Sequence, residues 1–261
     1  MPLSPQPNSV NQGALLTSAM IKILILGGTS EASALADAIA KRGLPAIFSY
    51  AGRVNSPKPQ PLPTRIGGFG GVSRLVAFLA QERITHIVDA THPFAVQMSA
   101  NVIAAAAQCG VKAIALTRPA WQPVDGDQWQ SVASIDEAVS ALAGPPQRVL
   151  LAIGRMHLAA FAAQPQHHYV LRLVDQPTSP PSLADYTAVI DRGPFTLEGD
   201  LALLETQRIE RIVCKNSGGE GAASKLIAAR RLGLPIVMIE RPHLPSRHEA
   251  HTVDEVINWI T

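Results

Sequence analysis

A glycine pair followed by two hydroxyl residues ends the first strand-like run of the chain. Gly27 and Gly28 are followed by Thr29, Ser30 and Glu31. Glycines let the backbone approach a phosphate closely, and free N–H groups at a helix start attract an anion. The turn therefore favours a nucleotide-phosphate site, although the full G-x-G-x-x-G fingerprint is absent. A tight strand-to-helix turn with Thr29 or Ser30 as the helix N-cap is the structural alternative.

The end of the next strand-like segment indicates which dinucleotide would bind. About twenty residues after the glycine turn, an NAD enzyme places an Asp or Glu that binds the ribose hydroxyls. This sequence instead has Ser49, Tyr50, Ala51, Gly52 and Arg53. A hydroxyl and a guanidinium would bind a 2′-phosphate, whereas a carboxylate would repel it. The segment favours NADP over NAD, and a solvated surface arginine is the alternative interpretation of Arg53.

A second glycine-rich stretch surrounds one aromatic residue. It reads Arg65-Ile66-Gly67-Gly68-Phe69-Gly70-Gly71. Its backbone could lie flat against a planar ligand, because four glycines leave it without bulky side chains. A simple turn before the next helix is the alternative, although a turn rarely needs four glycines.

Polar residues also follow the third strand-like segment. Asp89 is followed by Ala90, Thr91 and His92. Catalytic and cofactor contacts concentrate at the carboxyl edge of such sheets. His92 could donate a proton in the reaction, or could equally hydrogen-bond the following loop.

The second half of the chain carries further candidate anion ligands. Lys215, Asn216, Ser217, Gly218 and Gly219 end a strand-like run and resemble a second anion cradle with a lysine point charge. Arg241 follows the last strand-like run and adds another cation. The histidines and the two cysteines show no metal-ligand spacing, and no G-x-S-x-G elbow indicates a hydrolase.

The elements that must position these residues alternate between strand and helix. Apolar β-rich runs are followed by Ala-rich amphipathic stretches, as in repeated βα units that form parallel sheets. In the first half we expect strands at 21–26, 46–50, 86–90 and 113–117, and helices at 30–42, 72–81 and 96–108. In the second half we expect strands at 148–153, 169–174, 188–191, 211–214 and 236–239, and helices at 197–206, 222–232 and 252–259.

The segment 119–130, rich in Pro, Gly, Asp and Trp, breaks this rhythm and is expected to cross between two lobes. The predicted fold class is α/β, with two Rossmann-like lobes, parallel sheets and a cleft between them. We expect a disordered extension over 1–19, a nucleotide-binding lobe over 20–125 and a substrate-binding α/β lobe over 126–261. In such architectures the ligand binds at the carboxyl ends of the strands.

Composition excludes several other classes of protein. The 261 residues are 47% hydrophobic and 16% charged, and 22 Lys+Arg against 20 Asp+Glu give a net charge of +2. This total indicates no nucleic-acid partner, and no apolar run reaches the ~20 residues needed to span a membrane. The few cysteines and the lack of a signal-peptide pattern favour a cytoplasmic location. No Asp or Glu occurs between Ala38 and Gln81, a stretch that contains six Lys and Arg, so the cations are segregated.

Taken in order, the motifs are similar to those of the precorrin-6A reductase family of cobalamin biosynthesis. The resemblance extends from about Met20 to the C-terminus and also includes Thr117-Arg118-Pro119 and Glu240-Arg241-Pro242. It implies NADPH as cofactor, hydride delivery to C19 of precorrin-6A and reduction of the C18–C19 double bond to give precorrin-6B. Reduction also needs a proton at C18, for which His92 and solvent are the two candidates.

The resemblance also implies which residues meet each ligand. The cofactor set is Gly27, Gly28, Thr29, Ser30, Glu31, Ser49, Gly52, Arg53 and Thr91, with Ser49 and Arg53 near the 2′-phosphate. The set for the tetrapyrrole substrate is Arg65, Gly68, Phe69, Arg118, Lys215, Ser217, Gly218 and Arg241. No metal site is expected.

Other functions remain open at this level. The family also includes reductases of the cobalt-loaded substrate, and a different small-molecule reductase using NADPH would share the cofactor motifs. A two-lobed protein that only binds an anionic ligand is the non-enzyme alternative. The product of the reaction is either released or handed directly to a pathway methyltransferase.

Overall fold

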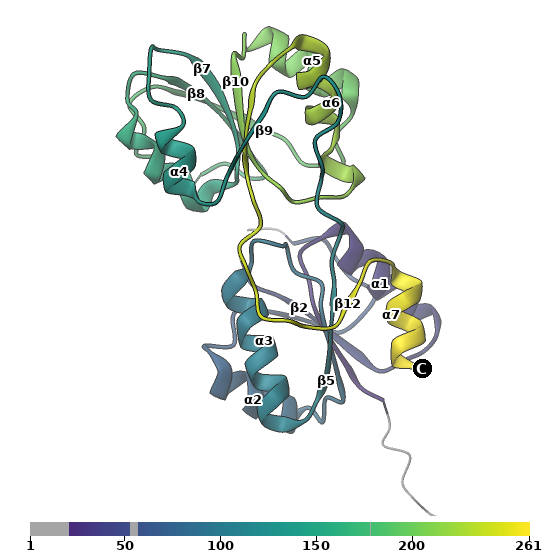
Figure 1. Cartoon of the computed structure of the whole chain (residues 1–261). Helices are drawn as coiled ribbons and strands as arrows, with labels where there is room; N and C mark the ends of the chain where they lie inside the picture. Colours follow the sequence, from purple (N-terminus) through teal and green to yellow (C-terminus); the bar gives the residue numbers. More distant parts are fainter. Residues whose placement is uncertain (1–20, 53–56, 178) are drawn as a thin grey trace, which may run out of the picture.

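The chain folds into two α/β lobes, each built on a six-stranded parallel sheet (Figure 1). The computed structural model describes residues 21–52, 57–177 and 179–261. The predicted α/β class with two parallel sheets is therefore confirmed. The expected extension 1–19 and the predicted phosphate ligand Arg53 lie outside the described residues.

The first sheet has the strand order β12-β5-β4-β1-β2-β3. Helices α1 and α7 pack on one face of this sheet, and α2 and α3 on the other. Its strands are β1 (Ile23–Leu26), β2 (Ala46–Tyr50), β3 (Thr64–Ile66), β4 (His86–Asp89), β5 (Lys112–Leu116) and β12 (Glu249–Ala250). Its helices are α1 (Ser30–Lys41), α2 (Val72–Gln81), α3 (Val96–Cys109) and α7 (Val253–Ile260).

The second sheet repeats this arrangement with the order β6-β11-β10-β7-β8-β9. Its strands are β6 (Trp129–Val132), β7 (Arg148–Ala152), β8 (His168–Leu173), β9 (Tyr186–Ile190), β10 (Arg211–Lys215) and β11 (Ile236–Ile239). Its helices are α4 (Ile135–Ser140), α5 (Leu197–Thr206) and α6 (Ser224–Leu232), with 3₁₀ segments at Arg155–Ala163 and Glu220–Ala222. The helix expected at 222–232 thus begins two residues later, after a 3₁₀ turn.

The central strands owe their positions to continuous apolar runs. Every residue of β1 and of β11 is buried, as expected for parallel strands covered on both faces. Burying these runs against the helices drives the folding of each lobe.

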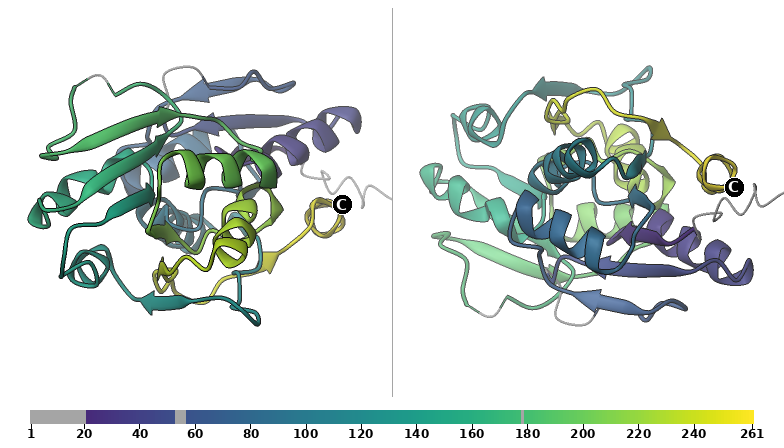
Figure 2. Two further views of the ribbon diagram at one scale, coloured as in Figure 1. Left: turned by 90° about the horizontal axis from the view of Figure 1, so that it is seen from above. Right: turned by 90° about the horizontal axis from the view of Figure 1, so that it is seen from below.

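The chain crosses between the lobes twice, over residues 117–128 (the first crossing) and over residues 240–248 (the return crossing). Each crossing leads to an outer strand of a sheet and then to a helix. The first crossing leads to β6, which pairs with β11, and α4 follows it. The return crossing leads to β12, which pairs with β5, and α7 then packs on the core beside α1 (Figures 1 and 2). The expected boundary at 126–261 is therefore corrected, because residues from Glu249 onward belong to the first lobe.

Candidate functional site between the two lobes

The carboxyl edges of the two sheets face each other. The ammonium group of Lys215, at the end of β10, lies 5.1 Å from the ring centroid of Phe94, in the loop after β4. Arg241, just beyond β11, donates from Nη1 to the carbonyl of Arg118, just beyond β5, at 2.7 Å. Motifs from the two halves of the sequence therefore meet in one region, as predicted.

The two glycines after β1 have different roles. A Cβ on Gly27 would lie 2.0 Å from the ring of Phe48, so this glycine makes room for a buried aromatic ring. Gly28 has φ +131°, is exposed and has nothing within 4 Å of a built Cβ. Gly28 therefore forms the turn and leaves open space in front of the first turn of α1. The N–H groups at a helix start can bind an anion such as a phosphate.

Thr29 is the N-cap of α1, and its hydroxyl is fully engaged within the protein. Oγ1 accepts from the N–H of Ala32 at 3.1 Å and donates to the carbonyl of Ala90 at 2.9 Å. The N-cap alternative is thus confirmed for Thr29. Ser30 begins the helix, is exposed and directs its hydroxyl to Glu31 at 3.1 Å.

Two predicted ligand residues pair with each other. Glu31 and Arg118 form an ion pair at 3.6 Å, and the Arg118 side chain is 13% exposed. A glutamate of the predicted cofactor set therefore forms an ion pair with an arginine of the predicted substrate set. This contact also joins the first turn of α1 to the start of the first crossing.

Arg65, predicted as a substrate ligand, contacts Ser49, which was predicted as a cofactor ligand. Arg65 stands opposite Ser49 in the β2–β3 register, and its Nη1 donates to Ser49 Oγ at 2.7 Å. The same guanidinium donates to the carbonyls of Gly67 and Gly68. It stacks on the ring of Phe69, with its carbon 4.0 Å from the ring centroid.

The ring of Phe69 packs against other side chains of the protein. Arg65 lies over the ring, and Phe78 packs against it edge-on with centroids 5.1 Å apart. The glycines around Phe69 allow the loop to fold back on Arg65, as shown by the left-handed φ of +120° at Gly67. Gly52, with φ +76°, lies against this loop.

A buried carboxylate organises the loop after β4. Asp89 accepts from the hydroxyls of Thr91 and Ser99, both at 2.6 Å, and from Arg247 Nη1 at 3.1 Å. The predicted cofactor ligand Thr91 therefore uses its hydroxyl proton to hold Asp89. Arg247 was not predicted for the site; it lies in the return crossing, far from β4 in sequence.

His92 is exposed beside this loop. Its Nδ1 accepts from the N–H of Phe94 at 3.2 Å. Because Nδ1 accepts, the proton of the neutral ring lies on Nε2. The loop-binding role and the proton-donor role are thus compatible in one geometry.

The glycine loop after β10 receives the first crossing. A Cβ on Gly218 would lie 2.1 Å from the carbonyl oxygen of Pro119, and one on Gly219 would lie 2.2 Å from the Arg118 side chain. Both glycines have left-handed φ values, near +70°. The crossing chain therefore fills the space on the Cβ side of Gly218 and Gly219. The anion-binding role of Ser217 and Gly218 stays a prediction.

Arg241 ties the loop and both crossings together. Besides Arg118, its guanidinium donates to the carbonyls of Asn216 at 2.9 Å and Ser217 at 3.1 Å. These hydrogen bonds supply no negative charge, and no ion pair of Arg241 occurs among the residues that the structure describes. Burial lowers the pKa of Arg241, and the neighbouring Arg118 adds to this effect. The arginine thus retains capacity for an anion.

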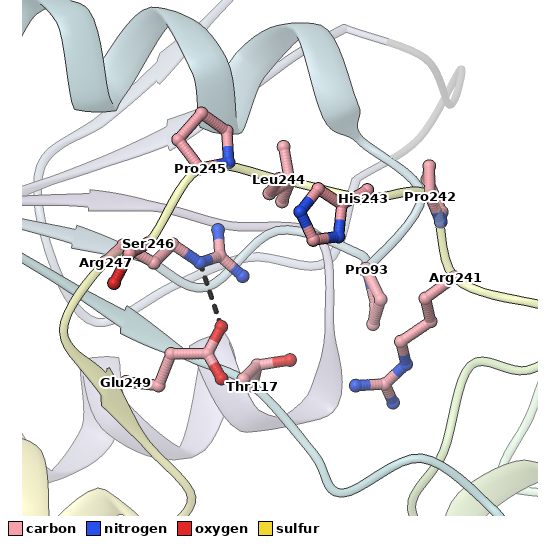
Figure 3. A pocket seen from close by; sticks show the side chains of 10 residues that line it. All are labelled: Pro93, Thr117, Arg241, Pro242, His243, Leu244, Pro245, Ser246, Arg247 and Glu249. Atoms are coloured by element: carbon pink, nitrogen blue, oxygen red, sulfur yellow. Dashed lines mark hydrogen bonds and ion pairs between the residues drawn. The ribbon is translucent and has the colours of Figure 1, made fainter.

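Arg241 lies at the wall of a cavity of about 560 Å³ between the first lobe and the return crossing (Figure 3). Arg247 is paired across the cavity wall with Glu249 at 3.0 Å, as the dashed line in Figure 3 shows. The other lining residues come from the loop after β4, from the position just after β5 and from the return crossing: Pro93, Thr117, Pro242, His243, Leu244, Pro245 and Ser246.

Trp121 anchors the first crossing to the second lobe, and the sequence analysis did not identify it. Its backbone N–H and carbonyl pair with the side-chain amide of Asn216, and its indole N–H donates to Gly219. The buried Lys225 lies 4.4 Å from its ring centroid. A tryptophan inside a Pro-rich crossing was the one sequence signal for such an anchor.

Exposed apolar side chains mark the same edge of the second sheet. Met156 follows β7, Val174 follows β8 and Ile190 ends β9, and each is at least 40% exposed. Ile66, at the end of β3 in the first lobe, is 60% exposed. These positions offer apolar contact to a large ligand.

The described residues contain neither a metal-binding cluster nor a membrane-spanning helix. They contain no cluster of three His, Cys, Asp or Glu side chains able to hold a metal ion. Nor does any helix within 21–52, 57–177 and 179–261 have the length and apolarity to cross a membrane.

Comparison with known proteins gives one consistent family. Residues 22–261 match the family model "Precorrin-6x reductase CbiJ/CobK". The chain is 54% identical over 241 residues to a precorrin-6A reductase of Rhodobacter capsulatus, covering 92% of this chain and 96% of that protein. A cobalt-precorrin-6A reductase of Priestia megaterium is 29% identical over 250 residues, covering 91% and 97%.

A solved structure titled "CobK precorrin-6A reductase" superposes with a TM-score of 0.90 at 54% identity. The match covers 92% of this chain and 96% of that one. The similarity therefore extends over both lobes.

Proposed function

Because the chain belongs to the CbiJ/CobK family of precorrin-6x reductases, we propose that it reduces precorrin-6A to precorrin-6B with NADPH in cobalamin biosynthesis. The C18–C19 double bond would receive a hydride at C19 and a proton at C18. Beyond the family, the observation that carries this proposal is the meeting, in one interlobe region, of the open glycine turn before α1 with Arg241 and Lys215 of the second half of the chain.

The first lobe would hold the cofactor. NADPH, when bound, supplies the hydride. The turn at Gly28 and the first N–H groups of α1 would hold its pyrophosphate, since that turn is open. The end of β2 has Ser49 and Tyr50 in place of the carboxylate that binds the ribose of NAD.

The region between the two sheet edges would hold the substrate. Precorrin-6A carries many carboxylates on an apolar macrocycle, so its site needs both cations and apolar surface. Arg241 at the cavity and Lys215 opposite Phe94 supply the cations. Met156, Val174 and Ile190 supply apolar surface at the same sheet edge. The protein's task is to hold the macrocycle at near-attack distance and to exclude water.

His92 is the proposed proton donor. The proton of the neutral ring lies on Nε2, because Nδ1 accepts from the backbone N–H of Phe94. A donor positioned in this way contributes roughly 10²–10⁴-fold in rate. Delivery of the C18 proton from solvent is the alternative.

The metal-free substrate is favoured over the cobalt-loaded one, because identity is higher to the relative with the metal-free name. We also propose a cytoplasmic location, where NADPH is regenerated and the free thiols of Cys109 and Cys214 stay reduced. A direct hand-over of product to a pathway methyltransferase would keep precorrin-6B out of water.

Incubation of the purified chain with precorrin-6A and NADPH tests the activity. Mass analysis should show a gain of two hydrogens in the tetrapyrrole, with NADPH consumed in equal amount. Parallel incubations with NADH and with cobalt-precorrin-6A should be much slower. No mass gain with either substrate would overturn the proposed function, and a faster reaction of the cobalt-loaded substrate would reverse the substrate preference.

A further inference from the structure

We propose that Arg65 is the residue by which this protein distinguishes NADPH from NADH, through an ion pair with the 2′-phosphate. The inference rests on the proposed function only for the identity of the cofactor. It assigns the arginine of β3 a role that the sequence suggested for Arg53, in the loop after β2.

The position of Arg65 is the first argument. In a Rossmann-like lobe the end of the second strand meets the adenosine ribose. Ser49 occupies that position, since it pairs with Leu26 of β1 and its carbonyl accepts from the N–H of Gly27. The Nη1 atom of Arg65 lies 2.7 Å from the hydroxyl of this same Ser49. The guanidinium is therefore at the place where a 2′-phosphate differs from a hydroxyl.

The second argument is that the guanidinium is already fixed in place. Two carbonyls of the glycine loop accept from it, at 2.8 Å for Gly67 and 3.3 Å for Gly68. The rings of Phe69 and Phe78 lie 4.0 and 5.3 Å from its central carbon. A pre-organised arginine loses little freedom when it binds an anion. Gly67 and Gly68 thus have a physical role, because their carbonyls hold the guanidinium in place.

The third argument is charge. Within the described ranges no carboxylate forms an ion pair with Arg65, and its hydrogen bonds all go to neutral oxygens. Burial without such a partner lowers the pKa of Arg65. A phosphate would neutralise the charge through charge-assisted hydrogen bonds. No Asp or Glu between Ala38 and Gln81 competes for it.

Binding measurements on the full chain test this inference without relying on turnover. Dissociation constants for NADPH, NADH, adenosine 2′,5′-bisphosphate and AMP should be measured for the wild type, Arg65→Gln and Arg65→Lys. Arg42→Gln is the matched control, because it removes an exposed arginine of the same lobe at the far end of α1. Thermal unfolding should verify that each variant is folded.

We expect Arg65→Gln to weaken NADPH and the 2′,5′-bisphosphate roughly 10- to 100-fold, as for a lost charged hydrogen bond. NADH and AMP should change by less than about threefold, and Arg65→Lys should retain part of the preference. Arg42→Gln should leave all four constants within about twofold.

Two outcomes would overturn the inference. Equal loss of NADPH and NADH would show that Arg65 only supports the glycine loop. An unchanged preference would assign the 2′-phosphate to another residue. A wild type that binds neither dinucleotide would instead overturn the proposed function, so the two failures are distinguishable.

Discussion

At the residue scale, side chains predicted to meet ligands often have a partner within the protein. Thr29 caps α1, Arg118 pairs with Glu31, and Thr91 holds Asp89. The common reason is that the carboxyl edge of a parallel sheet exposes many backbone groups, and short polar side chains satisfy them locally. Charged residues that form no ion pair are therefore better candidates for ligand contact than residues chosen by type alone. Arg65 and Arg241 meet that criterion within the part of the chain that the structure describes.

His92 gives a prediction at this scale. His92→Ala should slow turnover at least 10-fold with NADPH affinity unchanged, because it removes the Nε2–H donor. His92→Asn is the informative companion, since its side-chain oxygen can still accept from the N–H of Phe94 but cannot supply the proton. Single-turnover rates and NADPH titration measure the two effects. Full activity in His92→Asn would assign His92 to loop positioning, and full activity in both variants would assign the proton to solvent.

At the element scale, the two crossings decide which helices belong to which lobe. The first helix after each crossing begins with the same capping arrangement. The N-caps Ser134 and Thr252 accept from the N–H of Glu137 and Glu255, whose carboxylates accept from the N–H of Ala133 and His251. These capping boxes fix where α4 and α7 start. They contain no information about which sheet each helix covers, and the apolar faces of the helices decide that.

Ile257 of α7 tests this assignment. Its side chain is 5% exposed in the core shared with α1, so Ile257→Ala should lower the free energy of unfolding by about 2–4 kcal/mol. Ile227→Ala on α6 is the matched control, with a residue 38% exposed and an expected loss under about 1 kcal/mol. Urea unfolding of both variants gives the comparison. Equal losses would contradict a structural role for α7 in the first lobe.

At the scale of the whole molecule, the two crossings are joined to each other and to both lobes. Arg241 bridges the start of one crossing and the loop after β10, and Trp121 docks the first crossing on the second lobe. Arg247 joins the return crossing to Asp89 of the first lobe. The cavity of Figure 3 is lined mainly by the return crossing, which is held at Arg241 and at Arg247. This attachment favours a preformed site.

The Arg247–Asp89 pair gives the prediction for this scale. Arg247→Met should cost about 3 kcal/mol of unfolding free energy, because it leaves a buried carboxylate without its cation. In the double variant with Asp89→Asn, the loss should be smaller than the sum of the single losses by about 1–2 kcal/mol. Lys22→Met, which breaks a half-exposed pair with Glu82 in the same lobe, should cost less than about 1 kcal/mol. Strictly additive losses would show that Arg247 and Asp89 do not interact in solution.

The sequence by itself determined the alternation of strands and helices, the two parallel sheets and the motifs at their carboxyl edges. These features are local, since a buried apolar run, a glycine turn or a capping box acts within a few residues. Four elements matched at both ends: β2, β11, α2 and α5. Others matched within one residue at each end: α1, α3, α7, β4, β5, β7, β8 and β10. The short strands β3, β6 and β12 were missed, because two to four residues carry too little periodicity.

Only the tertiary structure decided the partners of the charged residues and the lobe to which the C-terminal segment belongs. Strand register places Arg65 beside Ser49, 16 residues away, and the return crossing places Arg247 beside Asp89, 158 residues away. Such contacts depend on which strands pair and on where the chain crosses between lobes. A local sequence pattern cannot predict the strand pairing or the position of the crossings. Both are selected by the free energy of burying whole sheets and helices together.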